Sequence, residues 1–366
     1  MQLALELLQT ILSLLERPEL LVVRMANQTL RTLATPLALQ EVGVRDTVAS
    51  AERFIALKES ASQDIIQSVR TVVFRDSTDG WTDVPDEESR LVQVPRAMSD
   101  LNSVFPQLTA LRLEFTEFFY EDVFSDTEST YWLKLQHAIL EAVTSTRLKS
   151  LTLYNLITMP SPLFASDAFA AFLSPLETLD IETLGPDTLT EGVFSAEPLD
   201  EFWAQMGGVL SAAQSVSSLR LHSHELLGSF PTLTLPIKPF PNLTSLHLTG
   251  LCAQNEGIES FLLLHASTLQ CLTLNKCPLY GDEREYARPW AAVIHTLDSD
   301  AGLTELVELN VDEETMGYCY VDPGWGIMTT DMEDEAEEAL RVDREDDLRA
   351  LEAWREAVER RRMTRD

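Results

Sequence analysis

The sequence has few of the residues that build metal centres, disulfide frameworks and anion-binding surfaces. Four of its 366 residues are cysteines, at positions 252, 271, 277 and 319, and no two form a CxxC pair. This spacing supports neither a disulfide framework nor a zinc site, so we expect a reducing, intracellular location in the cytoplasm or the nucleus. Lys and Arg number 27 against 59 Asp and Glu, which gives a net charge of -32. Such a chain is poorly suited to bind nucleic acid or an anionic membrane.

Long apolar runs and catalytic motifs are also missing. No stretch of about 18 uncharged apolar residues occurs, so no membrane span is expected. The leucine-rich start lacks the basic residues of a secretory leader, and Glu6, Gln9 and Glu16 interrupt its apolar run. The motifs GxxxxGK[ST], GxSxG, HExxH and GxGxxG are absent. The sequence therefore predicts neither an enzyme nor a bound cofactor.

What the sequence does contain is an internal repeat. The segment FPQLTALRL at 105–113 returns as FPNLTSLHL at 240–248. Their shared LxxLxL core recurs, with conservative replacements, at intervals of 26 to 40 residues. Its eight occurrences begin at Val69, Leu108, Leu148, Leu176, Val216, Leu243, Leu269 and Leu306. Leucine-rich repeats have periods of 20–29 residues, so the longer intervals are expected to carry loop insertions.

The period of two within LxL predicts strands with one buried and one displayed face. Helix-like segments separate the strands, at 131–143, 167–173, 199–213, 257–267 and 288–297. The pattern predicts an α/β fold, a leucine-rich-repeat solenoid in which parallel strands alternate with helices. An ordinary α/β domain with a chance set of buried strands is the alternative.

The displayed face of the strands is the candidate surface for a protein target, because solenoids present extended surfaces there. The alternative is a solvated face of ordinary polar residues. The segment HSH at 222–224 lacks a third metal ligand at a recognisable spacing, and His224, like Cys277, is expected to serve the turn after its strand. The predicted target-binding residues are Arg112, Glu114, Tyr154, Asp180, Glu182, Arg220, His222, His247, Asn275, Asn310 and Asp312.

The N-terminal segment is predicted to form three short helices. One apolar stripe runs through Leu5, Leu8, Leu12 and Leu15, and a second runs through Leu3, Leu7, Ile11 and Leu14. Pro18 ends the first helix and suits the first turn of the next. Three helices this short cannot build an independent core of useful size, so they must lean on the solenoid, on a partner or on both.

The segments LALELLQTILSLL and PELLVVRMANQTLRTLATPLALQEV, followed by ERFIAL and SVRTVVF, resemble the F-box and leucine-rich-repeat proteins that are numerous in filamentous fungi. The resemblance implies that the F-box-like module docks onto the Skp adaptor and, through it, a cullin. The repeats would then recruit a protein target for ubiquitination. The implied adaptor-binding residues are Leu3, Leu5, Leu7, Leu8, Ile11, Leu12, Leu15, Pro18, Leu20 and Leu21.

The predicted organisation has four parts: the F-box-like module at 1–42, a linker helix at 43–63, the solenoid at 64–315 and a charged tail at 316–366. Leu351, Trp354 and Val358 form a thin apolar stripe in the tail, which is expected to be a partly detached helix. The predicted function is substrate recognition in a cullin-RING ubiquitin ligase. Because Ala4 stands where the family has proline, the alternative is an interaction scaffold in which a degenerate F-box serves only as an N-terminal cap.

Overall fold

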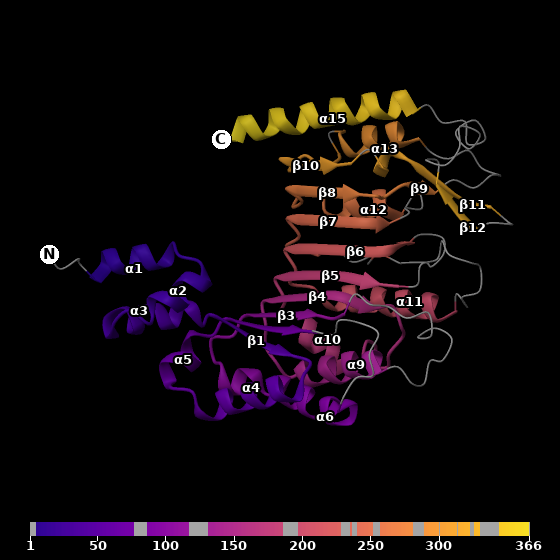
Figure 1. The fold of residues 1–366 in the computed structure, drawn as a ribbon. Coiled ribbons are helices and arrows are strands. Elements are labelled where there is room, and N and C mark those ends of the chain that lie inside the picture. Colours follow the sequence, from indigo (N-terminus) through magenta and orange to yellow (C-terminus); the bar gives the residue numbers. More distant parts are fainter. Residues whose placement is uncertain are drawn as a thin grey trace. The chain divides into compact units, whose positions relative to one another are not determined.

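The protein is described from a computed structural model that covers residues 5–76, 86–116, 131–185, 197–227, 235, 240–251, 257–280, 289–299, 301–312, 314–322, 326–329 and 344–365. Its main feature is a nine-stranded sheet in which neighbours in space follow one another along the chain (Figure 1). The strands are β1 (Glu41–Arg45), β2 (Thr71–Arg75), β3 (Ala110–Glu114), β4 (Ser150–Ile157), β5 (Thr178–Leu184), β6 (Ser218–Leu227), β7 (Ser245–Leu251), β8 (Cys271–Asn275) and β10 (Glu308–Val311).

The chain divides into two compact units. Unit 1 holds residues 1–118 and 131–154, and unit 2 holds residues 119–130 and 155–366. The helices of unit 1 are α1 (Leu5–Ser13), α2 (Arg17–Val23), α3 (Gln28–Ala38), α4 (Val48–Ser60), α5 (Gln63–Ser68), α6 (Glu87–Met98), α7 (Leu101–Val104) and α9 (Tyr131–Val143).

Unit 2 carries helices and a second, smaller sheet. Its helices are α10 (Asp167–Leu173), α11 (Glu197–Ala212), α12 (Gly257–Leu264), α13 (Trp290–Leu297), the 3₁₀ helix η1 (Glu314–Met316) and α15 (Arg344–Arg365). The second sheet has the order β12-β11-β9, with β9 (Leu279–Tyr280), β11 (Tyr318–Asp322) and β12 (Gly326–Thr329). Within it, β11 pairs with β12 antiparallel and with β9 parallel.

A repeating backbone contact sets the register of the main sheet. The N–H groups of Arg70 and Thr71 both donate to the Gln40 carbonyl oxygen, at 2.8 and 2.9 Å. Those of Thr109 and Ala110 donate in the same way to Arg70, at 2.9 and 3.0 Å. The arrangement recurs at the start of β4, β6, β7, β8 and β10. Each repeat thus enters the sheet at the same backbone position, which keeps the strands parallel and in step.

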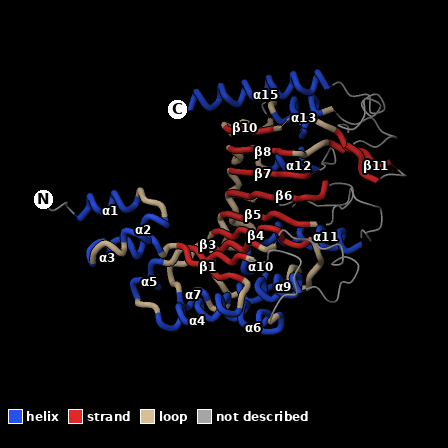
Figure 2. The backbone as a smooth tube through the Cα atoms, viewed as in Figure 1, coloured by secondary structure: helices blue, strands red, loops and turns tan. Residues whose placement is uncertain are grey.

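Within each unit, one face of the sheet is buried and the other is left open. In β3 the side chains of Leu111 and Leu113 are buried, and in β5 those of Leu179 and Ile181 are buried, while the residues between them are half-exposed. Figure 2 shows helices α4, α6 and α9 together on one side of β1, β2 and β3. We call the other side the open face of each unit.

The phenylalanine of each FPxLTxLxL segment anchors its repeat. Phe105 is fully buried and lies 6.0 Å from the Phe54 ring of α4. Phe240, which is equally buried, packs on Phe261 of α12 and on the His265 ring. The backbone N–H of Phe240 also donates to His265 Nε2 at 2.9 Å. In both segments the phenylalanine is buried against an aromatic ring, from a helix that precedes the segment for Phe105 and from one that follows it for Phe240.

Side-chain caps define where several helices begin. The Asn27 side chain accepts the N–H of Leu30 at 2.9 Å at the start of α3. Thr47 and Ser166 act in the same way at the starts of α4 and α10. Each cap satisfies a backbone donor that the helix itself leaves unpaired, and is worth about 1 kcal/mol.

A buried ion pair joins the end of β1 to α6. Arg90 Nη1 lies 3.0 Å from Asp46 Oδ2, and both side chains are almost fully buried. Tyr131, the first residue of α9, lies beside this pair, and burial raises the pKa of its hydroxyl to about 12. Removing one partner of such a pair would leave an uncompensated buried charge.

All eight strands expected from LxxLxL are present, as are the five helices expected between them. The structure differs from the expected division of the chain at two places. Residues 43–63 contain the expected helix, α4, but they also include most of β1, which pairs with β2 over all five of its residues. The C-terminal helix is docked rather than detached, because Leu351, Trp354 and Val358 are buried where α15 packs against α13 and β10.

Candidate interaction surfaces

The N-terminal module, α1 to α3, has a small apolar core of its own. Leu12 of α1, Leu20 of α2 and Ala34 and Ala38 of α3 are buried in it. Its partly buried members are Leu15, Val23, Leu30, Leu33 and Leu37. Leu8 is half-buried, so the stripe through Leu8, Leu12 and Leu15 points into the module.

The second stripe of α1 is exposed. Leu7, Ile11 and Leu14 follow one another at helical spacing and are 53%, 45% and 80% exposed. The α2 segment adds Val22 and Met25, which are even more exposed than Ile11. Soluble proteins rarely leave several large apolar side chains in water without a reason, so this surface is a candidate for partner binding.

The structure sorts the predicted adaptor-binding residues into three groups. Leu5, Leu7, Ile11, Pro18 and Leu21 are exposed, while Leu8 and Leu15 are half-buried. Leu12 and Leu20 belong to the module's own core and are not available to a partner, and Leu3 lies outside the described residues. The prediction left out Leu14, Val22 and Met25. Leu14 could have been included, because it continues the stripe of Leu7 and Ile11.

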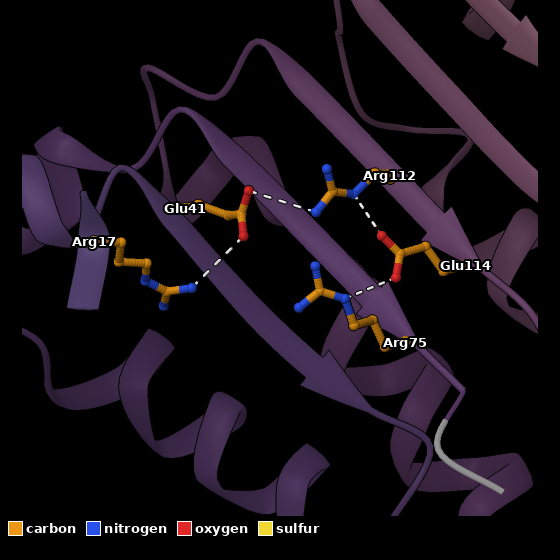
Figure 3. A network of polar contacts seen from close by, with 5 residues as sticks. All are labelled: Arg17, Glu41, Arg75, Arg112 and Glu114. Carbon is orange, nitrogen blue, oxygen red and sulfur yellow. Dashed lines mark hydrogen bonds and ion pairs between the residues drawn. The ribbon is translucent and has the colours of Figure 1, made fainter. Parts of the chain in front are cut away.

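On the open face of unit 1, charged side chains form a connected network (Figure 3). Glu41 of β1 lies between Arg17 of α2 and Arg112 of β3, at 3.6 and 3.7 Å. Glu114 accepts a hydrogen bond from Arg75 Nε at 2.7 Å. Its other oxygen lies 2.7 Å from Arg112 Nε, at an angle outside that of a hydrogen bond. The network ties α2 of the module to the first three strands of the sheet.

On the open face of unit 2, oppositely charged side chains pair across β5 and β6. The register places Asp180 beside Arg220 and Glu182 beside His222. The charged atoms of these pairs lie 3.6 and 3.3 Å apart. The face predicted for target binding is therefore largely occupied by contacts among its own side chains.

His247 of β7 continues this face. Its Nε2 lies 3.3 Å from the Asn275 side-chain amide of β8. Burial lowers the pKa of His247, and the charges of Arg220 and His222 lower it further. His247 is therefore a mainly neutral, half-buried hydrogen-bonding group near pH 7.

The remaining predicted target-binding residues differ in their surroundings. Tyr154 stands beside Glu114 in the register of β3 and β4, and Asn310 is exposed on β10. Asp312 lies one residue beyond β10, and its carboxylate accepts the backbone N–H groups of Lys276 and Thr315. Asp312 therefore stabilises a turn between repeats, a role that its place in the strand pattern did not indicate.

Cys277 also serves a turn, as its repeat position predicted. Its thiol contacts the Asn275 carbonyl oxygen at 3.1 Å, and its N–H donates to Thr315 Oγ1 at 3.2 Å. Burial raises the pKa of this thiol to about 12, so it is a structural rather than a nucleophilic cysteine. The side chain of His224 lies outside what the structure describes.

The described part of the chain contains no group of three or more His, Cys, Asp and Glu side chains placed to hold a metal ion. None of its helices combines the length and the apolar composition needed to cross a bilayer. Comparison with models of known protein families gives no match, and neither does comparison with curated proteins.

Proposed function

We propose that the chain is a substrate-recognition subunit of a cullin-RING ubiquitin ligase, an F-box protein in which α1 to α3 bind a Skp-type adaptor. The open face of the strands holds a protein target, and the chain itself performs no chemistry. The observation that carries the proposal is the exposed stripe of Leu7, Ile11 and Leu14 on a helix whose neighbouring stripe already packs inside the module.

The stripe is large enough to support a specific interface. Fully burying a leucine or isoleucine is worth roughly 1.5–3 kcal/mol, and Leu7, Ile11 and Leu14 are 53%, 45% and 80% exposed, so burying the rest of them contributes about 3–5 kcal/mol before the costs of association. Val22 and Met25 enlarge the available apolar area. A charged residue at the centre of the stripe would remove most of this gain, because its desolvation is unfavourable.

The proposal is tested by co-purifying the full chain with a Skp adaptor and comparing Ile11→Asp and Leu14→Asp with the wild type. Both positions are exposed, so the module should still fold, whereas Leu12 is part of the core and is unsuitable. Gln9→Asp is the matched control, since Gln9 is exposed on the other side of α1. We expect the first two variants to lose the adaptor and the control to retain it.

If the wild type does not bind the adaptor, the receptor proposal is wrong. The module would then serve as an N-terminal cap in an interaction scaffold. One observation favours this second function, namely the Arg17–Glu41 contact that ties α2 to the first strand of the sheet. Replacement of Arg17 by Gln would separate the two functions, because a cap should lose stability while an adaptor-binding module should keep its adaptor.

A further inference from the structure

The open face of unit 1 carries a local charge opposite to that of the chain. Arg45, Arg75 and Arg112 lie on this face of β1, β2 and β3, and Arg17 reaches it from α2. Glu41 and Glu114 are the acidic members of the same network. Four arginines and two glutamates give a net charge of +2, in a chain whose overall net charge is -32.

The arrangement of these arginines is costly for the sheet alone. Arg45 and Arg75 are direct partners in the register of β1 and β2, and neighbouring strands lie about 4.8 Å apart. Like charges placed side by side across strands destabilise a sheet. An anion bound between them would relieve that repulsion.

The two glutamates orient the arginines without using up their donors. Glu114 is shared between Arg75 and Arg112, and each arginine faces it through Nε. Within the described residues the terminal nitrogens of Arg75 and the guanidinium of Arg45 form no hydrogen bond or ion pair, and the Arg75 side chain is 48% exposed. These donors have the fork geometry that binds carboxylates in pairs.

We propose that the open face of β1, β2 and β3 binds an acidic peptide segment, whose carboxylates pair with Arg45 and Arg75 and are flanked by Arg17 and Arg112. A long polyanion would meet the negative field of the whole chain. A short acidic segment meets mainly the local charge, because the Debye length is about 8 Å at physiological ionic strength. In the function proposed above, this acidic segment would belong to the protein target. Only that assignment rests on the proposed function.

The test uses the full chain and a short fluorescent peptide of alternating Glu and Gly, with binding followed by fluorescence anisotropy. We expect saturable binding that weakens as salt is added. The double variant Arg45→Gln/Arg75→Gln should bind roughly fivefold to thirtyfold more weakly, as expected for the loss of two exposed ion pairs. The matched control is Arg53→Gln, which removes an exposed arginine from α4, and it should bind as the wild type does.

Absence of binding by the wild type, or equal binding by the double variant and the Arg53→Gln control, would overturn the inference. A peptide of alternating Lys and Gly serves as a second probe, and weaker binding of it by the double variant would also count against an acidic ligand. Adaptor co-purification and peptide binding, both measured on the wild type, separate the two proposals. Adaptor binding without peptide binding refutes this inference alone, and peptide binding without adaptor binding refutes the adaptor proposal alone.

Discussion

The C-terminal helix α15 should detach from its unit when Trp354 is truncated. Trp354 is 1% exposed and lies on the side of α15 that packs against α13 and β10. Replacing a buried tryptophan by alanine costs about 3–5 kcal/mol. Since about 1.4 kcal/mol is a factor of ten, the population with α15 detached should rise roughly 10² to 10⁴-fold in Trp354→Ala.

Polar anchors hold the remainder of the helix and lower the detached population of the wild type and of Trp354→Ala alike. The Asp347 carboxylate is fully buried and accepts the N–H of Ala291 at 2.7 Å and the hydroxyl of Tyr318. Arg361 donates to the Leu303 carbonyl oxygen at 3.2 Å. Asp347 and Arg361 lie on either side of Trp354 along α15. In Trp354→Ala we therefore expect the middle of α15 to lose its packing before the two anchored ends do.

Hydrogen exchange followed by mass spectrometry measures the opening directly. Peptides that cover α15 should exchange faster in Trp354→Ala by the same factor, while peptides from unit 1 should not change. Trypsin gives an independent readout, because α15 contains seven arginines. The control is Met363→Ala, which truncates a side chain that is 64% exposed.

Equal hydrogen-exchange rates of α15 in the wild type and in Trp354→Ala would refute the predicted detachment. That result would describe a helix already free in solution, as the sequence alone suggested. The prediction is also wrong if Met363→Ala opens the helix as strongly, because burial of Trp354 would then not be the cause.

Two further predictions concern single positions. Gly302→Ala should lower the free energy of unfolding, because the new Cβ would lie 2.2 Å from the Leu297 carbonyl oxygen. Gly208→Ala should raise the free energy of unfolding by roughly 0.5–1 kcal/mol, because Gly208 lies in helix α11 with space for the methyl group. Urea unfolding of each variant measures both effects. Burial lowers the pKa of His265 below 6.5, so the unfolded chain binds the proton more readily than the folded chain does. The stability that the neutral ring contributes is therefore present above about pH 6.5 and is lost as the pH falls below that value. The stability difference between the wild type and His265→Gln should therefore shrink by up to about 1.4 kcal/mol between about pH 7.5 and pH 5.5, and a difference that does not change with pH would contradict this.

The repeat pattern predicted most of the sheet because it records contacts local to each repeat. Every LxxLxL places two side chains on the buried face of one strand, and that is sufficient to locate the strand and its direction. The missed strand β1 fits the same pattern, with Leu39, Val42 and Val44 at the three apolar positions. This strand was not predicted because Gly43 separates the two valines and because the predicted N-terminal module extended to residue 42.

Contacts between distant segments were not predictable in the same way. The stripe of Leu351, Trp354 and Val358 was visible in the sequence, but the surface that receives it is built by α13 and β10. Likewise, the strand pattern placed Arg112 and Glu114 on a displayed face, but it could not show that they form one network with Glu41 and Arg17. Side-chain pairing of this kind depends on register across several strands, which a pattern within one strand does not contain.

In the N-terminal module, the apolar periodicity predicted two stripes on α1 but not which of them faces the core. Two apolar stripes on α1 were equally visible in the sequence, and either could have faced the module's core. The structure places Leu8, Leu12 and Leu15 inward and leaves Leu7, Ile11 and Leu14 outward. A helix that served only to close its own bundle would need one stripe, and replacing the second by polar residues would cost it nothing. The exposed second stripe is the feature that adaptor binding would use, and it identifies Ile11 and Leu14 as the positions where the two proposed functions respond differently to the same substitution.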